Sequence, residues 1–324
     1  MKICFLDNLK IPYTSKDLNS NKIRGAENAL INLSKELFKL DNEITVFNNC
    51  NYDCCLDGIR WVNINNIKDD FVFDIAITNN DMNLFNKIKS NKYIALSHSI
   101  QTLEKFIRKR QLISYLKYKP KIVILSKYHS KNRNKLLKLF GTINLEWAVD
   151  EIFISTPIND KIIRNLAIFT SRSDRNLDIL INIWKDHIYL NNKTAKLYVT
   201  PSDFIENKFN IYERNFTTRE LLIQDLLKSR VFLIPGHKGE LFCLAAEEAR
   251  ELCIPIVTLG IGSLSERVIH GKTGFIARNI SEFTKFTLDI LEDDSLWKEM
   301  RNNLLKMRGS KKWSSVATNF LSQI

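Results

Sequence analysis

The sequence has no apolar run long enough to cross a membrane. No window approaches the ~18 consecutive apolar residues that a spanning helix needs. At the N-terminus, Asp7 and Asn8 interrupt a short apolar segment, which excludes the apolar core of a secretory signal peptide. We therefore expect residues 3–6 to form a first buried strand, and the protein to be cytoplasmic.

The six cysteines lack the spacing of a disulfide framework or of a metal site. Cys50, Cys54 and Cys55 lie close together, but no nearby histidine or second cysteine pair supports zinc ligation. No Asp-x-Asp element follows a predicted strand either. We expect reduced thiols, a cysteine-containing loop and no metal ion or other cofactor.

Acidic residues are missing from residues 105–145, whereas twelve lysines and arginines lie there. In the rest of the chain the two signs balance, so the net charge of +12 is local. Such a basic face suits an anionic membrane, a phosphorylated lipid or nucleic acid, or it is simply solvated. Arg108, Lys109 and Arg110 are the candidates for contact with an acceptor or a membrane surface. Residues 103–118 predict an amphipathic helix, which fits either an interfacial helix or one docked on a sheet.

Strands and helices alternate along the chain, which predicts an α/β fold with doubly wound parallel sheets. Ligands of such sheets bind beyond the carboxyl ends of the strands. Thr217 and Glu220 have the spacing of a capping box before a helix. The expected strands are residues 3–6, 44–47, 61–64, 74–78, 93–96, 121–125, 166–170, 196–200, 231–234 and 254–259, with helices at 26–40, 82–88, 103–118, 244–252 and 313–324.

Two carboxylates, Glu240 and Glu248, lie in the loop and the helix between the strands at 231–234 and 254–259. The free amides and the positive dipole of a helix N-terminus suit an anion. An ionised carboxylate accepts hydrogen bonds and therefore suits hydroxyl groups. A nucleotide sugar carries both a diphosphate and hydroxyls.

Two further motifs follow this E-x7-E segment: GSLSERV at residues 262–268 and GKTGF at residues 271–275. Together the three motifs resemble those of the GT-B glycosyltransferases of the retaining family 4. The resemblance implies two Rossmann-like domains that face a central cleft. It places an acceptor-side domain at residues 1–155 and a nucleotide-sugar-binding domain at 156–305. A C-terminal helix at 306–324 would pack back on the first domain.

The resemblance also assigns roles to residues. Glu240 and His98 are the candidate catalytic residues, and Glu248 would hold the ribose. The other donor-binding candidates are Arg172, Arg175, Phe242, Cys243, Leu244 and Gly25. Three residues depart from glycines of the family motifs: Arg24, which would meet an anionic acceptor or point to solvent, Leu241 and Cys243.

The implied activity is metal-independent transfer of a hexosyl group from a nucleotide-diphosphate sugar to an acceptor hydroxyl, with retention. The basic face favours a lipid-linked or saccharide acceptor, as in envelope polysaccharide, lipopolysaccharide or glycolipid synthesis, and peripheral contact with the cytoplasmic face of an anionic membrane. Three alternatives remain open: a GT-B-like partner subunit without catalysis, a nucleotide-sugar epimerase, and a nucleic-acid-binding protein. The paired glutamates argue against nucleic acid as a partner.

Overall fold

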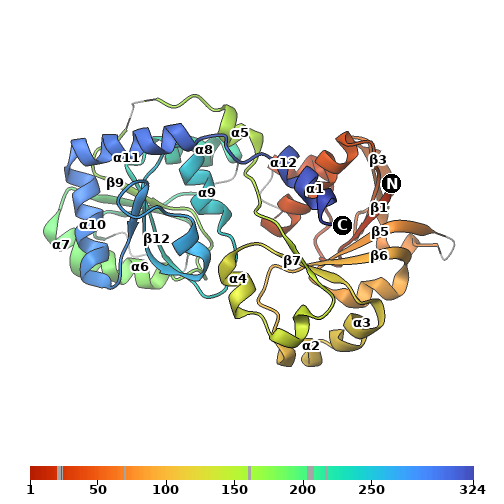
Figure 1. Cartoon of the computed structure of the whole chain (residues 1–324). Helices are drawn as coiled ribbons and strands as arrows, with labels where there is room; N and C mark the ends of the chain where they lie inside the picture. The colour runs from red at the N-terminus through yellow and green to blue at the C-terminus, as the bar shows by residue number, and fades with distance from the viewer. Residues whose placement is uncertain (20–22, 24, 69–70, 160–161, 203–207, 216–217) are drawn as a thin grey trace. The chain divides into compact units, whose positions relative to one another are not determined.

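A computed structural model shows the arrangement of the chain and describes residues 1–19, 23, 25–68, 71–159, 162–202, 208–215 and 218–324. The chain divides into two compact units. The first comprises Met1–Trp147 together with Trp313–Ile324, and the second comprises Ala148–Lys312 (Figure 1).

The first unit is built on a sheet with the strand order β3-β4-β2-β1-β5-β6-β7-β8. All neighbouring strands pair in parallel except β3 and β4, which are antiparallel. Its strands are β1 (Lys2–Leu6), β2 (Glu43–Asn48), β3 (Cys54–Leu56), β4 (Ile59–Asn63), β5 (Val72–Asn79), β6 (Lys89–Leu96), β7 (Lys121–Ile124) and β8 (Thr142–Asn144). Its helices are α1 (Gly25–Lys39), α2 (Leu103–Arg108), α3 (Gln111–Tyr118), α4 (Lys127–Asn132) and α12 (Trp313–Ser322), with 3-10 turns η1 (Ser15–Asn19), η2 (Ile64–Asn66), η3 (Met82–Lys87) and η4 (Lys135–Lys138).

The core of this unit forms on both faces of β1, where Ile3 to Leu6 are fully buried. Helix α1 covers one face because Ala29, Leu33 and Leu37 recur at helical spacing and are buried. The terminal helix α12 packs beside α1, which places it in the first unit (Figure 1).

The second unit has a parallel sheet of its own, in the order β11-β10-β9-β12-β13-β14. Its strands are β9 (Leu166–Phe169), β10 (Lys196–Val199), β11 (Ile211–Glu213), β12 (Val231–Gly236), β13 (Ile256–Ile261) and β14 (Gly274–Ile276). Its helices are α5 (Glu151–Ser155), α6 (Leu177–Ile183), α7 (Tyr189–Asn191), α8 (Arg219–Lys228), α9 (Leu244–Glu251), α10 (Ile280–Glu292) and α11 (Asp294–Met307), with a π-helical turn η5 (Trp184–Ile188) and a 3-10 turn η6 (Gly262–Glu266).

Both sheets reverse their winding direction beside the strand that comes first in the chain. In the second unit, β10 and β11 follow on one side of β9, and β12 to β14 on the other. The loops after β9 and β12 therefore leave adjacent strand ends in different directions. Such a switch point is where doubly wound sheets bind ligands.

Residues 82–88 form the 3-10 turn η3 in place of the predicted helix, and the short strands β3, β8, β11 and β14 were not predicted. Two predicted helix boundaries also differ from the structure. Residues 103–118 form α2 and α3 in place of one helix, with Arg110 between them at φ 54°. Phe106 and Tyr115 are nine residues apart, so a continuous helix would turn them to opposite sides. The break lets both side chains enter one core, with ring centroids 5.8 Å apart.

The second difference concerns the start of α8. Thr217 lies outside the described residues, and the cap is Thr218, whose hydroxyl accepts from the Leu221 amide at 3.3 Å. The helix therefore begins one residue later than the capping-box spacing indicates.

Candidate active site

The candidate site lies at the switch point of the second sheet, where the loops after β9 and β12 meet. Asn176, at the start of α6, donates its side-chain amide to the carbonyl of Gly236 at 2.5 Å. This bond holds the two loops together. Arg172 and Arg175 come from the first loop, and Glu240 comes from the second.

Arg175, from the loop after β9, contacts two residues of the loop after β12. Its Nε lies 3.0 Å from a carboxylate oxygen of Glu240, and its Nη1 donates to Nδ1 of His237 at 3.0 Å. The same Nδ1 accepts from the Gly239 amide at 2.9 Å. His237 therefore carries its proton on Nε2. Sequence reasoning had found no definite role for this histidine, which here fixes the direction of an arginine.

Arg172 does not join this cluster. Its Nε donates to the carboxylate of Asp174 at 2.9 Å, and its side chain is 47% exposed. An exposed arginine with one local partner is free to turn toward a ligand at modest cost, since surface ion pairs are weak. Arg175 is thus pre-oriented and Arg172 is adaptable.

The N-terminus of α9 faces the same carboxyl edge, because this helix follows β12 after a short loop. Phe242 is buried, and Leu244 is the half-buried first residue of the helix. Leu241 and Cys243 replace two glycines of the family motif, and both side chains are buried. Cys243 adopts the left-handed conformation with φ 64° that a glycine takes without strain, whereas Leu241 is not among the described residues with positive φ. Both replacing side chains thus point into the interior, and Cys243 keeps a backbone conformation that favours glycine.

The two motif glutamates lie on either side of Cys243. Its thiol is hydrogen-bonded to Glu240 and also feels the charge of Glu248. Burial, followed by the charge of Glu240, raises the pKa of the thiol far above its ordinary value. Cys243 is therefore a neutral thiol, which excludes a thiolate nucleophile at this position.

Glu248 has an arginine partner that the sequence analysis missed. Arg219, the first residue of α8, lies 2.9 Å from Glu248 and 3.1 Å from Asp150. Burial raises the pKa of Glu248, while Arg219 opposes that rise. The two carboxylates raise the pKa of Arg219 against its own desolvation. Nothing in the local sequence marks Arg219, since its partners are 69 and 29 positions away.

His98 follows β6 in the first unit, at the carboxyl edge of that sheet. Its backbone amide donates to Asn80 at 2.9 Å, and its ring stacks on Trp147 with a centroid distance of 6.4 Å. Its Nε2 is buried and has no hydrogen-bond partner among the described residues. Burial lowers the pKa of His98 to about 4. The residue is thus a neutral imidazole whose orphaned nitrogen suits a ligand hydroxyl.

The remaining predicted residues also lie in the first unit. Gly25 is exposed and opens α1, while Arg24 lies outside the described residues. Arg108, Lys109 and Arg110 are exposed at the junction of α2 and α3. Figure 1 shows these two helices beside the end of the first sheet.

Residues 204–307 match the family model described as Glycosyl transferases group 1. This segment contains β12, α9 and the switch-point loop that carries Glu240. This part of the chain is therefore similar to the group 1 glycosyltransferases. Solved structures agree with this assignment in their fold, which is GT-B.

Three structures illustrate how closely the fold of this chain follows that of known glycosyltransferases. Sucrose-phosphate synthase of Thermosynechococcus elongatus is 12% identical with a TM-score of 0.71, over 99% of this chain and 97% of that chain. HepE of Anabaena in complex with UDP and glucose is 14% identical with a TM-score of 0.71, over 100% and 99%. WaaG, a glycosyltransferase involved in lipopolysaccharide biosynthesis, is 11% identical with a TM-score of 0.68, over 98% and 97%. No curated protein sequence matches the chain.

Proposed function

We propose that this protein is a glycosyltransferase that moves a hexosyl group from a nucleotide-diphosphate sugar to an acceptor hydroxyl, with retention at the anomeric carbon. The observation that carries the proposal is the cluster of Arg175, His237 and Glu240 beside the N-terminus of α9, at the switch point of the second sheet. It combines donors for a diphosphate with a carboxylate for sugar hydroxyls.

The chemical difficulty is the charge that grows on the leaving diphosphate as the bond to the anomeric carbon breaks. Arg175, Arg172 and the backbone amides at Phe242–Leu244 supply positive charge and donors there, each typically contributing a few kcal/mol. The acceptor oxygen forms the new bond on the same face. Its proton passes to the departing diphosphate, so no protein nucleophile and no metal ion is required in the proposed step.

The two glutamates and His98 would hold hydroxyl groups. Glu240 is placed for the sugar, and Glu248 for the ribose. Because Arg219 keeps Glu248 charged in a buried position, this carboxylate can accept two hydroxyl hydrogen bonds. The neutral ring of His98 would donate to or accept from the transferred sugar.

The UDP-containing HepE structure supports a nucleotide-diphosphate donor, and the name of WaaG supports a role in envelope polysaccharide, lipopolysaccharide or glycolipid synthesis. We extend the proposal to a lipid-linked or saccharide acceptor reached at the cytoplasmic face of a membrane. Among the described residues, no helix has the length and apolar character needed to pass through a bilayer. Contact with the membrane would therefore be peripheral.

The basic face of the first unit supports that contact. Helix α3 docks through Tyr115 but leaves Ile113 75% exposed, and Leu139, which directly follows η4, is 70% exposed. Tyr115 ties the two segments together through Phe140, at a ring distance of 4.8 Å. Exposed apolar side chains among lysines and arginines are the pattern of an interfacial surface. In this proposal the segment docks on the sheet with one face and presents the other face to the membrane.

The donor is tested by thermal shift with UDP, GDP, ADP and their glucose conjugates, on the wild type, Glu248→Gln and the surface control Glu282→Gln. One base should raise the melting temperature of the wild type and the control, because a ligand that binds only the folded state stabilises it. The shift should disappear in Glu248→Gln. Turnover with that donor should be abolished in Glu240→Ala and Glu248→Ala.

Each alternative gives a different result in the same experiment. Donor binding without turnover would identify a binding or partner subunit, and conversion of the donor without an acceptor would identify an epimerase. Retention of full activity in Glu240→Ala would refute the assignment of the site. Chelation by EDTA should leave turnover unchanged.

Membrane contact is tested by co-sedimentation with phosphatidylglycerol vesicles. The wild type should bind them and should not bind phosphatidylcholine. The double variant Ile113→Ser/Arg108→Gln should bind these vesicles at least tenfold more weakly. Its rate of sugar transfer to soluble acceptor analogues should equal that of the wild type. Equal binding by this variant would refute the assigned surface.

A further inference from the structure

The second unit contains a cavity that the proposed transfer reaction does not use. It has a volume of about 560 Å³ and lies at the amino ends of the strands, because Arg164 precedes β9 and Arg230 immediately precedes β12. Arg172, Arg175 and Glu240 follow the carboxyl ends of the same two strands. The cavity and the candidate active site therefore lie at opposite edges of one sheet.

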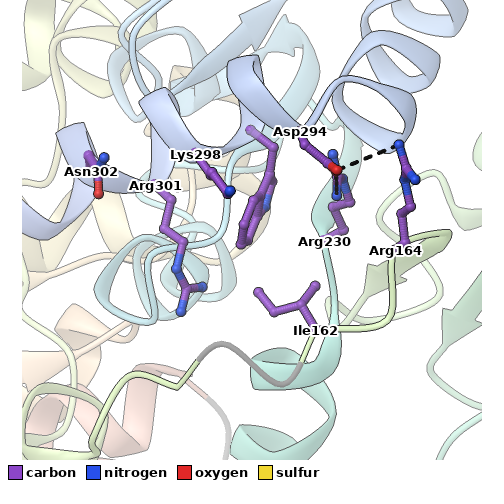
Figure 2. A pocket seen from close by; sticks show the side chains of 8 residues that line it. Ile162, Arg164, Arg230, Asp294, Lys298, Arg301 and Asn302 are labelled. Atoms are coloured by element: carbon purple, nitrogen blue, oxygen red, sulfur yellow. Dashed lines mark hydrogen bonds and ion pairs between the residues drawn. The ribbon is translucent and has the colours of Figure 1, made fainter.

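The lining of this cavity is strongly cationic. It includes Arg164, Arg230, Lys298 and Arg301, against Asp294 as the one carboxylate among the lining residues. The formal charge of the lining is thus +3. Figure 2 shows Asp294 beside the end of Arg230, with a dashed line from Asp294 to Arg164. One carboxylate is shared by two guanidinium groups, at 2.7 Å from Arg230 and 3.6 Å from Arg164.

The buried part of the lining is held rigidly. The side chain of Arg230 is only 4% exposed, and its Nε donates to the Ile290 carbonyl at 2.6 Å. Its Nη2 has no hydrogen-bond partner among the described residues. The guanidinium groups of Arg230 and Arg301 both lie over the indole of Trp297, each 5.1 Å from the ring centroid. These contacts keep two positive charges in fixed positions beside the cavity.

Arginines that are held rigidly and outnumber the neighbouring carboxylates form an arrangement suited to binding phosphate. A guanidinium group offers a planar pair of donors that matches phosphate oxygens, and it stays charged when it is desolvated. The volume lies in the range of small-molecule sites. A lining of +3 complements the two or three negative charges of a phosphate ester or a diphosphate.

We propose that this cavity is a second ligand site of the protein, which binds the phosphate group of a small molecule at the edge of the sheet opposite the donor site. Arg230, Arg301 and Trp297 form its preformed wall. Arg164, from the segment before β9, and Lys298, from α11, are exposed and complete the lining. The site is independent of whether the protein transfers a sugar.

The test is calorimetric titration with inorganic phosphate and pyrophosphate. Arg164→Gln/Lys298→Gln lowers the lining charge from +3 to +1 by changes of exposed residues only. Lys193→Gln/Lys285→Gln removes the same charge from exposed positions elsewhere in the unit and is the matched control. Arg172→Gln/Arg175→Gln removes phosphate binding at the donor site, so that the two sites are measured separately.

We expect saturable pyrophosphate binding that persists in Arg172→Gln/Arg175→Gln and in the lysine control, and that weakens at least tenfold in Arg164→Gln/Lys298→Gln. Sedimentation with phosphatidylglycerol vesicles, compared between Arg164→Gln/Lys298→Gln and the lysine control, distinguishes a lipid headgroup from a free phosphate compound as the source of the group. Weaker vesicle binding by the cavity variant than by the control indicates a headgroup, and equal binding indicates a free compound, because both variants keep the surface of the first unit. Unchanged affinity in Arg164→Gln/Lys298→Gln, with an unchanged melting temperature, would overturn the proposal. Loss of all pyrophosphate binding in Arg172→Gln/Arg175→Gln would do the same, and would leave the donor site as the one anion site detected.

Discussion

At the scale of the residue, the motif positions of this protein have long-range partners. Arg175 is paired with Glu240, and Arg219 with Glu248, so each motif glutamate has its own arginine. Cys243 lies between the two carboxylates in a backbone conformation that favours glycine. The site thus depends on residues outside its own segment, and two substitutions test this.

The first substitution is Arg219→Met. It would leave Glu248 and Asp150 as two buried carboxylates without their cation, and breaking a buried pair typically costs about 3–5 kcal/mol. The pKa of Glu248 is already raised, so the folded state binds its proton more tightly than the unfolded state. Such a group destabilises the fold as pH rises, and removal of Arg219 strengthens this effect.

Urea denaturation at pH 7.5 and pH 5 measures this difference. The loss of stability in Arg219→Met should be larger at pH 7.5 than at pH 5, because Glu248 without Arg219 takes up a proton more readily as the pH falls. Arg219→Lys keeps the charge and should show a smaller loss with less dependence on pH. An equal loss at both pH values would show that Glu248 does not titrate in this way.

The second substitution compares glycine with alanine at Cys243. Both remove the buried thiol, but alanine retains the left-handed strain, which costs about 1–2 kcal/mol. Cys243→Gly should therefore be more stable than Cys243→Ala, the reverse of the usual order in regular structure. Denaturant titration of the two variants gives the answer directly. A Cys243→Ala variant more stable than Cys243→Gly would contradict the left-handed backbone conformation at this position.

At the scale of the element, the loop after β13 fits closely against the loop after β12. Gly262 has φ +77°, and a Cβ there would lie 2.5 Å from the His237 carbonyl and 2.9 Å from the Glu240 carbonyl. The Ser263 amide also donates to that Glu240 carbonyl at 2.9 Å. The glycine thus lets η6 support the loop that carries Glu240.

Gly271 provides a matched control for this contact, because it has φ +76° but nothing within 4 Å of its Cβ position. Gly271→Ala should cost only the conformational strain of about 1–2 kcal/mol. Gly262→Ala should cost more and should also weaken donor binding, since the Glu240 loop must shift. Stability and nucleotide affinity of both variants are the measurements. Equal effects of the two substitutions would contradict the close fit.

At the scale of the whole molecule, the first unit contains buried neutral histidines that make it sensitive to acid. His129 is fully buried, accepts from the Leu125 amide at Nδ1 and lies 2.9 Å from Gln101 through Nε2. Burial lowers the pKa of His129 to about 3, and that of His98 to about 4. His129 thus has a structural role that its sequence context left unassigned.

The unfolded state takes up a proton near the ordinary histidine pKa of about 6.5, while the folded state does not. The stability that these groups provide is complete above pH ~6.5 and falls as the pH falls toward the folded values. At pH 5, His129 alone should lower the free energy of unfolding by roughly 2 kcal/mol. Denaturation at pH 7.5 and pH 5 measures the effect, and His129→Asn should show a smaller pH dependence. A flat profile in the wild type would contradict the neutral buried state.

The sequence predicted more of the fold than of the candidate site. Alternation of apolar strands and amphipathic helices predicted both parallel sheets, because burial on two faces imposes apolar residues locally. The break between α2 and α3 was not predicted, since it depends on Phe106 and Tyr115 reaching one core. Arg219 and His237 were not assigned for the same reason, because their roles come from partners on other elements.

The sequence by itself determined the alternation of the main strands and helices, the E-x7-E segment and the local excess of positive charge. These are properties of neighbouring residues, and neighbours fix periodicity, turn chemistry and charge density. Only the tertiary structure decided which strands lie side by side, which arginine meets which glutamate, and that Arg164, Arg230 and Arg301 surround one cavity. Ion pairs and cavities depend on distances between residues far apart in the chain, and folding alone sets those distances.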